Sequence, residues 1–310
     1  MRPVIAAALV LGVTLAGCAA PSEAPSPAAS ATATATQDAF PADAVRFDPE
    51  HDYGDRYADG ILPVGDEKWS TSAPAVGTVF LCRDTFVPDG QAGAQNRGPW
   101  FVNDNTEWDI SLKPAVQGEV LWEPQLSIEV AGGIRTLTTN DLPDHPTGEF
   151  PVGESDPVKV YDRNPNSISE QHLEYRLTAE PAYGEPLCMG GEAGVMLTGV
   201  ALFNGFDAGG RDAGAWEVQD DCDGHPQNTG EYHYHTLSRC IDDIGVDTVI
   251  GYALDGFPIT GPTVGPGNIL TTADLDVCHG IVSDDIGYHY VMTQDFPYSV
   301  SCFRAQPTRP

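Results

Sequence analysis

Positive charge is scarce in this chain: 15 Lys and Arg residues stand against 45 Asp and Glu residues, which leaves a formal net charge of −30. A surface of this sign repels phosphate, so the composition excludes a nucleic-acid partner. It also opposes docking of the folded domain on an anionic membrane. An acidic chain is suited to collecting cations, although the charge can serve solubility alone.

Long amphipathic helices are missing as well. No stretch keeps the apolar spacing of a helix over three turns, while 26 Pro and 33 Gly residues interrupt many short apolar runs. Runs that are β-branched or alternate in polarity predict short strands at residues 76–82, 119–124, 125–130 and 134–139, with a Gly132-Gly133 hairpin turn between the last two. Residues 167–177 suit a helix or a strand, and we expect a strand. We therefore expect a single all-β domain over residues 46–310, a sandwich or a distorted barrel.

The N-terminal apolar run, Val4–Leu15, is too short to cross a bilayer as a stable anchor. It leads into Leu15-Ala16-Gly17-Cys18, which resembles the lipobox of bacterial lipoproteins. We expect residues 1–17 to be a lipoprotein signal peptide and Cys18 to carry the lipid; an ordinary secretory signal is the alternative. Residues 18–45 are rich in Ala, Ser, Thr and Pro and predict a disordered tether. The expected location is extracytoplasmic, with a lipid anchor in the bacterial cell membrane.

Signatures of common hydrolases are missing too, since the chain has neither Gly-x-Ser-x-Gly nor His-Glu-x-x-His. Histidines are instead concentrated in one stretch, where His225, His233 and His235 fall within eleven residues. If residues 232–235 form a strand, His233 and His235 share one face, and the two neighbouring tyrosines point the other way. Two imidazoles on one face can bind one metal ion, with His225 from the preceding turn as a third ligand. An exposed polar strand edge is the alternative interpretation.

A weaker copy of this stretch follows it. Cys222-x-Gly224 and Cys278-x-Gly280 are each followed by seven residues and then by Tyr-His-Tyr. We interpret residues 195–240 and 247–302 as an internal duplication within the C-terminal half. His289 is then equivalent to His233, and the copy has His279 of its own. We expect one shared site, built mainly from the first copy and completed by His279 or His289.

Cys18 aside, six cysteines remain, an even number that implies disulfides in an exported chain. Six cysteines allow fifteen pairings, and the duplication selects among them. It makes Cys222–Cys240 and Cys278–Cys302 equivalent bridges and leaves Cys82–Cys188 as the third. A Cys/His metal cluster is the competing interpretation.

Three segments resemble a known family: Gly-His-Pro-Gln with Tyr-His-Tyr-His, then Gly-Tyr-Ala-Leu-Asp-Gly-Phe-Pro-Ile, then Tyr-His-Tyr with Phe-Pro-Tyr and Cys-Phe-Arg. They look like the YHYH domain proteins, which are secreted or surface-attached bacterial proteins without a firmly assigned activity. The resemblance covers most of residues 75–305, and the motif that gives the family its name falls on Tyr232, His233, Tyr234 and His235. It implies a YHYH-type β domain and supplies no reaction.

Two hypotheses for function follow. In the first, the protein binds a divalent transition metal, Zn²⁺ or Cu²⁺, because all-nitrogen ligation suits these ions. Such a site would lose its metal near pH 5 as the imidazoles protonate, and an open coordination position would allow a metal-dependent enzyme. In the second, the chain is a non-catalytic surface binding module whose His/Tyr strands are structural. Neither a substrate nor a protein partner is identified by the sequence.

Several other side chains are weaker candidates. His145 is a candidate ligand and Glu149 a candidate base, both in a loop rich in turn-forming residues. Glu217 and the Asp220-Asp221 pair precede His225 closely enough to orient imidazoles as acceptors. They belong to an acidic segment, residues 206–223, that lacks the ligand spacing of an EF-hand, and we expect that segment to be solvated.

Overall fold

Short strands dominate the structure, a computed structural model that describes residues 40–42, 44–88 and 93–308. The expected signal peptide (residues 1–17), the lipidated Cys18 and most of the tether lie outside the described residues. Near the end of the expected tether, Phe40 and Ala44 pack against the main core, and the Phe40 ring meets the Tyr183 ring edge-on. In the described part of the chain, no helix is both long and apolar enough to cross a membrane.

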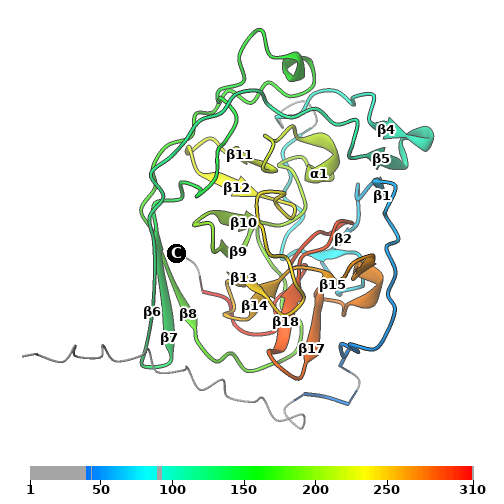
Figure 1. Cartoon of the computed structure of the whole chain (residues 1–310), viewed down its shortest axis with the longest axis vertical. Helices are drawn as coiled ribbons and strands as arrows, with labels where there is room; N and C mark the ends of the chain where they lie inside the picture. Colours follow the sequence, from blue (N-terminus) through cyan, green and yellow to red (C-terminus); the bar gives the residue numbers. More distant parts are fainter. Residues whose placement is uncertain (1–39, 43, 89–92, 309–310) are drawn as a thin grey trace, which may run out of the picture. The chain divides into compact units, whose positions relative to one another are not determined.

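An eight-stranded sheet organises the domain (Figure 1), with the strand order β11-β12-β10-β9-β13-β14-β18-β17. Its strands are β9 (Glu192–Met196), β10 (Ala201–Phe203), β11 (Gly224–Pro226), β12 (Tyr232–Tyr234), β13 (Val249–Ala253), β14 (Pro258–Thr260), β17 (Gly280–Ser283) and β18 (Gly287–Val291). β11 and β17 are the edges of this open sheet. The fold is mostly β, as the sequence predicts. The more specific expectation of a sandwich or a distorted barrel stays a prediction.

The two halves of the sheet share one pairing pattern. In each half an antiparallel pair, β9–β10 or β13–β14, joins a parallel partner, β12 or β18, which in turn pairs antiparallel with an edge strand. β9 and β13 join the halves. The strand order places β9 in the position that β13 has in the other half. The duplication of residues 195–240 and 247–302 itself stays a prediction.

Tyrosines are held in the same way in both halves. Tyr232 donates its hydroxyl hydrogen to Asp220, and Tyr288 donates to Asp276. A glycine lies against each ring: a Cβ on Gly224 would approach a Tyr232 ring atom to 2.2 Å. This close approach explains why each motif has glycine two residues after its cysteine.

Smaller sheets surround the large one. They comprise β1 (Ile61–Pro63) with β5 (Glu107–Asp109) and β4 (Phe101–Val102), β2 (Trp69–Ser70) with β3 (Val79–Phe80), β6 (Leu126–Ala131) with β7 (Ile134–Thr139) and β8 (Leu173–Thr178), and β15 (Thr263–Gly265) with β16 (Asn268–Ile269). The helical segments are α1 (Ala213–Trp216), η2 (Asn103–Asn105), η3 (Pro157–Val160) and η4 (Thr272–Asp274).

The predicted hairpin is confirmed: Ala131 pairs with Ile134, and Gly132 and Gly133 form the turn with φ of 59° and 77°. The strand expected within residues 167–177 is present as β8. Residues 119–124 were predicted wrongly, because they form a single isolated bridge from Val120 to Thr147 rather than a strand. The strand expected at residues 76–82 is shorter, since only β3 pairs regularly there.

Three disulfides cross-link the domain, and they join the pairs that the duplication selects: Cys82–Cys188, Cys222–Cys240 and Cys278–Cys302. All six thiols are consumed, so a Cys/His metal cluster of these cysteines is excluded. Three disulfides are typical of an oxidising, extracytoplasmic compartment.

Hydrophobic side chains form a main core that includes the tyrosines of β12 and β18. A second core gathers Trp100, Trp108 and Trp216, together with Ala215. Because Ala215 and Trp216 belong to α1, this second core anchors the helix that precedes Glu217.

Candidate metal centre

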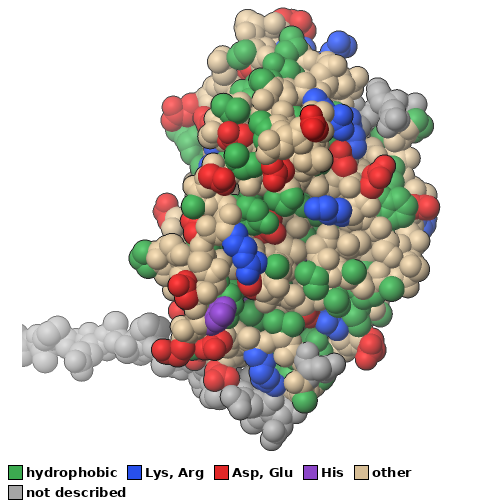
Figure 2. All heavy atoms as spheres, turned by 90° about the vertical axis from the view of Figure 1, so that its right-hand side faces the viewer, with side chains coloured by type: hydrophobic (Ala, Val, Ile, Leu, Met, Phe, Trp, Pro, Cys, Tyr) green, Lys and Arg blue, Asp and Glu red, His purple; other side chains and the backbone are tan. Residues whose placement is uncertain are grey.

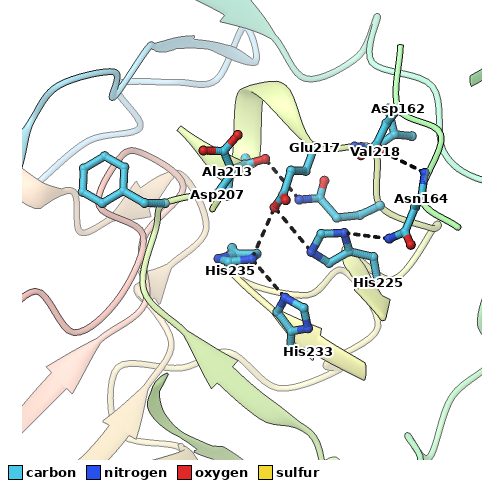
Figure 3. Close-up of polar contacts among 12 residues, drawn as sticks. Asp162, Asn164, Asp207, Ala213, Glu217, Val218, His225, His233 and His235 are labelled. Carbon is cyan, nitrogen blue, oxygen red and sulfur yellow. Dashed lines mark hydrogen bonds and ion pairs between the residues drawn. The ribbon is translucent and has the colours of Figure 1, made fainter. Parts of the chain in front are cut away.

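Three imidazoles converge at one end of the large sheet. The antiparallel register of β11 and β12 places His225 directly opposite His233, and His235 follows the last residue of β12. Each of the three is only 4% exposed. One ring nitrogen from each lies within 4.8 Å of the others, and Figure 3 shows the rings pointing toward a common point. The sequence prediction of a His225, His233 and His235 cluster thus agrees with the geometry.

The two tyrosines of the Tyr-His-Tyr-His segment lie on the other face of β12. Tyr232 donates to Asp220, and the Tyr234 hydroxyl contacts Thr198 at 3.2 Å. The backbone N–H of Tyr232 also donates to the buried Asp141. These contacts fix the strand, and they hold both phenols away from the imidazoles, as strand alternation predicts.

Backbone carbonyls determine the tautomers of two imidazoles. The Nδ1 atom of His235 lies 2.5 Å from the carbonyl oxygen of Asn204, and that of His233 lies 3.3 Å from the carbonyl oxygen of Glu231. A carbonyl oxygen only accepts, so both Nδ1 atoms carry hydrogen and both Nε2 atoms present bare lone pairs. These Nε2 atoms lie 3.1 Å apart. Two lone pairs at this separation repel each other unless a cation lies between them.

Glu217 completes the cluster with an oxygen. Its Oε2 atom lies 3.3 Å from His235 Nε2 and 3.4 Å from His225 Nε2 (Figure 3). Ligands about 2.0–2.1 Å from a tetrahedral zinc ion are about 3.3 Å from one another, so these separations fit such a site. Among the described residues, Glu217 Oε2 and His225 Nε2 have no hydrogen-bond partner. The sequence hypothesis gave Glu217 an orienting role; in the structure its carboxylate lies directly beside His225 and His235.

Burial controls the protonation of this cluster. It lowers the pKa of His235 to about 4 and lowers the pKa of His225 and His233 well below the usual value, with neighbouring imidazoles adding to the effect for the last two. Burial also raises the pKa of Glu217 well above its usual value, and Asp207 and Asp162 raise it further. The imidazoles are therefore neutral at neutral pH, which is the form of histidine that binds metals. Their depressed pKa moves the expected proton competition below the pH of 5 inferred from the sequence.

The position of Glu217 is set by tertiary contacts. It is the C-terminal cap of α1, and the N-terminal cap Asp212 accepts hydrogen bonds from the Tyr298 hydroxyl and from the backbone N–H of Gly65. At the other side of the helix, Lys113 donates to the Gly214 carbonyl and to the Gln219 side chain. These supports come from distant segments, so no local sequence signal reveals them.

His279 and His289 do not complete the site, which corrects the sequence prediction. His289 lies on β18, five strand positions from β12, a separation of about 24 Å at ordinary strand spacing. His279 Nε2 contacts the Thr293 hydroxyl, and His289 Nδ1 contacts the Gly287 carbonyl. Ile281 stands opposite His289 where His225 stands opposite His233, so that hairpin lacks the facing imidazole.

The weaker candidates also lie elsewhere. His145 Nε2 contacts the Tyr234 hydroxyl on the opposite face of β12, and the cysteines near it are bonded in a disulfide. Glu149 is exposed. Asp220 accepts from Tyr232 and from backbone N–H groups, while Asp221 is exposed, so neither orients an imidazole.

The acidic segment 206–223 is not solvated as expected. Asp207, Asp212 and Asp220 are at most 4% exposed. Asp207 pairs with Arg211, and Asp212 accepts from Tyr298. Buried carboxylates need such partners, which the sequence alone does not locate.

The cluster of three imidazoles faces a pocket of about 680 Å³. Its wall contains all three imidazoles and Glu217, together with Asp162 and residues from the segments 81–87, 164–166, 189–191 and 203–208. An ion at the cluster would therefore be reachable by a small molecule.

Comparison with known proteins identifies one family. The family model described as YHYH protein matches residues 174–265, a range that runs from β8 through β15 and is narrower than the 75–305 suggested by the motifs. Searches of curated proteins and of solved structures find no match. Residues 174–265 of this chain are thus a YHYH protein family domain.

Proposed function

We propose that this protein is an extracytoplasmic metal-binding protein that holds one divalent transition-metal ion between His225, His233, His235 and Glu217. The observation that carries the proposal is the group of facing acceptors: bare Nε2 atoms 3.1 Å apart, with a carboxylate oxygen 3.3 Å from one of them. A cation held between these groups makes the arrangement favourable.

Zinc suits the site better than copper. The three separations of 3.1, 3.3 and 3.4 Å are close to the edge of a tetrahedron around Zn²⁺, whereas Cu²⁺ prefers tetragonal geometry. A bound ion here would supply Lewis acidity at the wall of the pocket. The chain's own residues would orient it, because the Asn204 and Glu231 carbonyls hold the His235 and His233 rings.

Glu217→Gln is expected to change metal affinity and apo stability in different directions. Loss of the carboxylate ligand should weaken zinc binding at least about tenfold. The apo protein should be as stable as wild type or more stable at pH 7, because a carboxyl whose pKa is raised by folding destabilises the protein as pH rises above its ordinary 4.5. Protein purified without a His tag is analysed for bound metal, titrated against a chromophoric chelator, and unfolded in urea after metal removal.

Wild-type protein should carry about one zinc ion per chain, and Glu149→Gln, which changes an exposed carboxylate, should match it in both measurements. Metal-free wild-type protein whose melting temperature does not respond to added zinc would contradict the proposal. That result would favour a non-catalytic surface module in which the His/Tyr strands are structural.

We also propose that a lipid on Cys18 tethers the domain to the bacterial membrane. The support is the Leu15-Ala16-Gly17-Cys18 segment and the Ala-, Ser-, Thr- and Pro-rich stretch that follows it. Expressed in a bacterial host, the wild-type chain should partition with membranes and gain the mass of a lipid on its N-terminal cysteine. Cys18→Ala should abolish both, and a wild-type chain with an unmodified N-terminus would rule the anchor out.

A further inference from the structure

The pocket next to the metal centre differs from the rest of the molecule in charge. Acidic side chains are scattered over the face seen in Figure 2, as a net charge of −30 implies. Within the pocket wall, however, two of the carboxylates already have partners. Asp207 pairs with Arg211, and Asp162 accepts from the backbone N–H groups of Asn164 and Val218.

Arg83 adds a positive charge to this wall. It is the one Lys or Arg among the described residues that line the pocket, and it is exposed with no carboxylate partner in the described part of the chain. Asp162 and Glu217 together carry at most two negative charges, so a divalent ion at the cluster and Arg83 would leave the pocket positive overall. In a protein that is otherwise strongly acidic, this positive charge would attract anions to the pocket.

Apolar side chains form much of the remaining wall. Leu81 and Met189 are buried there, and Phe86 and Phe206 contribute rings whose centroids lie 6.0 Å apart. Phe203 packs on the His233 ring, with centroids 4.3 Å apart. A cavity of about 680 Å³ with apolar walls and few charged groups is typical of sites for small organic molecules.

We propose that the pocket binds a small organic anion, a carboxylate whose charged group contacts Arg83 and whose apolar body lies against the phenylalanine rings beside the metal. This inference rests on the proposed metal site, since the ion supplies much of the positive charge. Guanidinium and carboxylate groups match each other in shape and form charge-assisted hydrogen bonds, so Arg83 would select carboxylates over neutral molecules of equal size.

The test uses phenylacetate and zinc-loaded protein. Isothermal titration should show saturable binding to the wild type and at least about tenfold weaker binding to Arg83→Gln, the loss expected for one charge-assisted hydrogen bond. Arg163→Gln is the matched control, because Arg163 is also exposed but does not line the pocket, and its affinity should stay within about twofold of wild type. 2-Phenylethanol, which is neutral, should bind wild type and Arg83→Gln equally.

The outcomes separate this inference from the metal proposal. Phenylacetate that fails to bind zinc-loaded wild type, or that binds Arg83→Gln as tightly, overturns the anion site while zinc content stays at one per chain. Equal weakening by Arg163→Gln overturns the role of Arg83, because the effect would then be one of general charge. If the wild type holds no zinc, the metal proposal fails first, and binding of phenylacetate to that metal-free protein would contradict the link between the two.

Discussion

Replacing His233 and His235 together with alanine is expected to abolish zinc binding, from about one ion per chain to less than about a tenth. Structural zinc sites with four ligands contribute about 10–16 kcal/mol in total, so two ligands correspond to about 5–8 kcal/mol, or a loss of affinity of roughly 10⁴-fold or more. The two ligands that remain in this variant, His225 and Glu217, are too few to hold the ion. Metal analysis of tag-free protein after gel filtration measures the effect.

The chain contains a matched control for this experiment. His279→Ala/His289→Ala removes two buried imidazoles from the β17–β18 region, where no facing cluster forms among the described residues. This variant should keep its zinc, provided that circular dichroism shows the native fold. Zinc retained by the His233/His235 variant, or lost from a folded His279/His289 variant, would refute the assignment of the site.

Loss of the Cys82–Cys188 disulfide is expected to lower the free energy of unfolding by about 4–5 kcal/mol. This bridge spans 106 residues, and the stabilisation from restricting the unfolded chain grows with loop length. Cys82 is exposed and Cys188 is partly exposed, so Cys82→Ser/Cys188→Ser buries little new polar surface. Urea unfolding of the zinc-loaded variant and wild type gives the difference.

Cys222→Ser/Cys240→Ser is the comparison, because that bridge spans 18 residues and should contribute about 3 kcal/mol. Zinc content should be unchanged in the Cys82/Cys188 variant, since neither cysteine contacts the imidazoles. Because Cys222 is buried, its serine adds a cost of its own, so a smaller loss for the 106-residue loop than for the 18-residue loop would show that loop length does not dominate the difference.

Local rules predicted the part of the site that one strand supplies. Strand side chains alternate with a period of two, so Tyr-His-Tyr-His necessarily places His233 and His235 on one face and both tyrosines on the other. The same rule holds whatever surrounds the strand. Likewise, Gly132-Gly133 between two β-rich runs predicts a hairpin from backbone conformation alone.

Positions that depend on distant segments could not be predicted in this way. The sequence suggested that His279 or His289 would join the cluster, but the sheet order places the two Tyr-His-Tyr strands five positions apart. The acidic segment was expected in solvent, yet Arg211 and Tyr298 provide partners that allow Asp207 and Asp212 to be buried. Which strands are neighbours, and which charges find partners, are properties of the whole fold.

By itself, the sequence determined that two imidazoles share a strand face and that six cysteines are available in a repeated spacing. Only the tertiary structure decided that Glu217 lies beside the imidazoles. The reason is physical: α1 holds that carboxylate beside the imidazoles through Tyr298, Gly65 and Lys113, which are remote in sequence. Periodicity governs neighbours along a strand, whereas packing governs which distant groups meet.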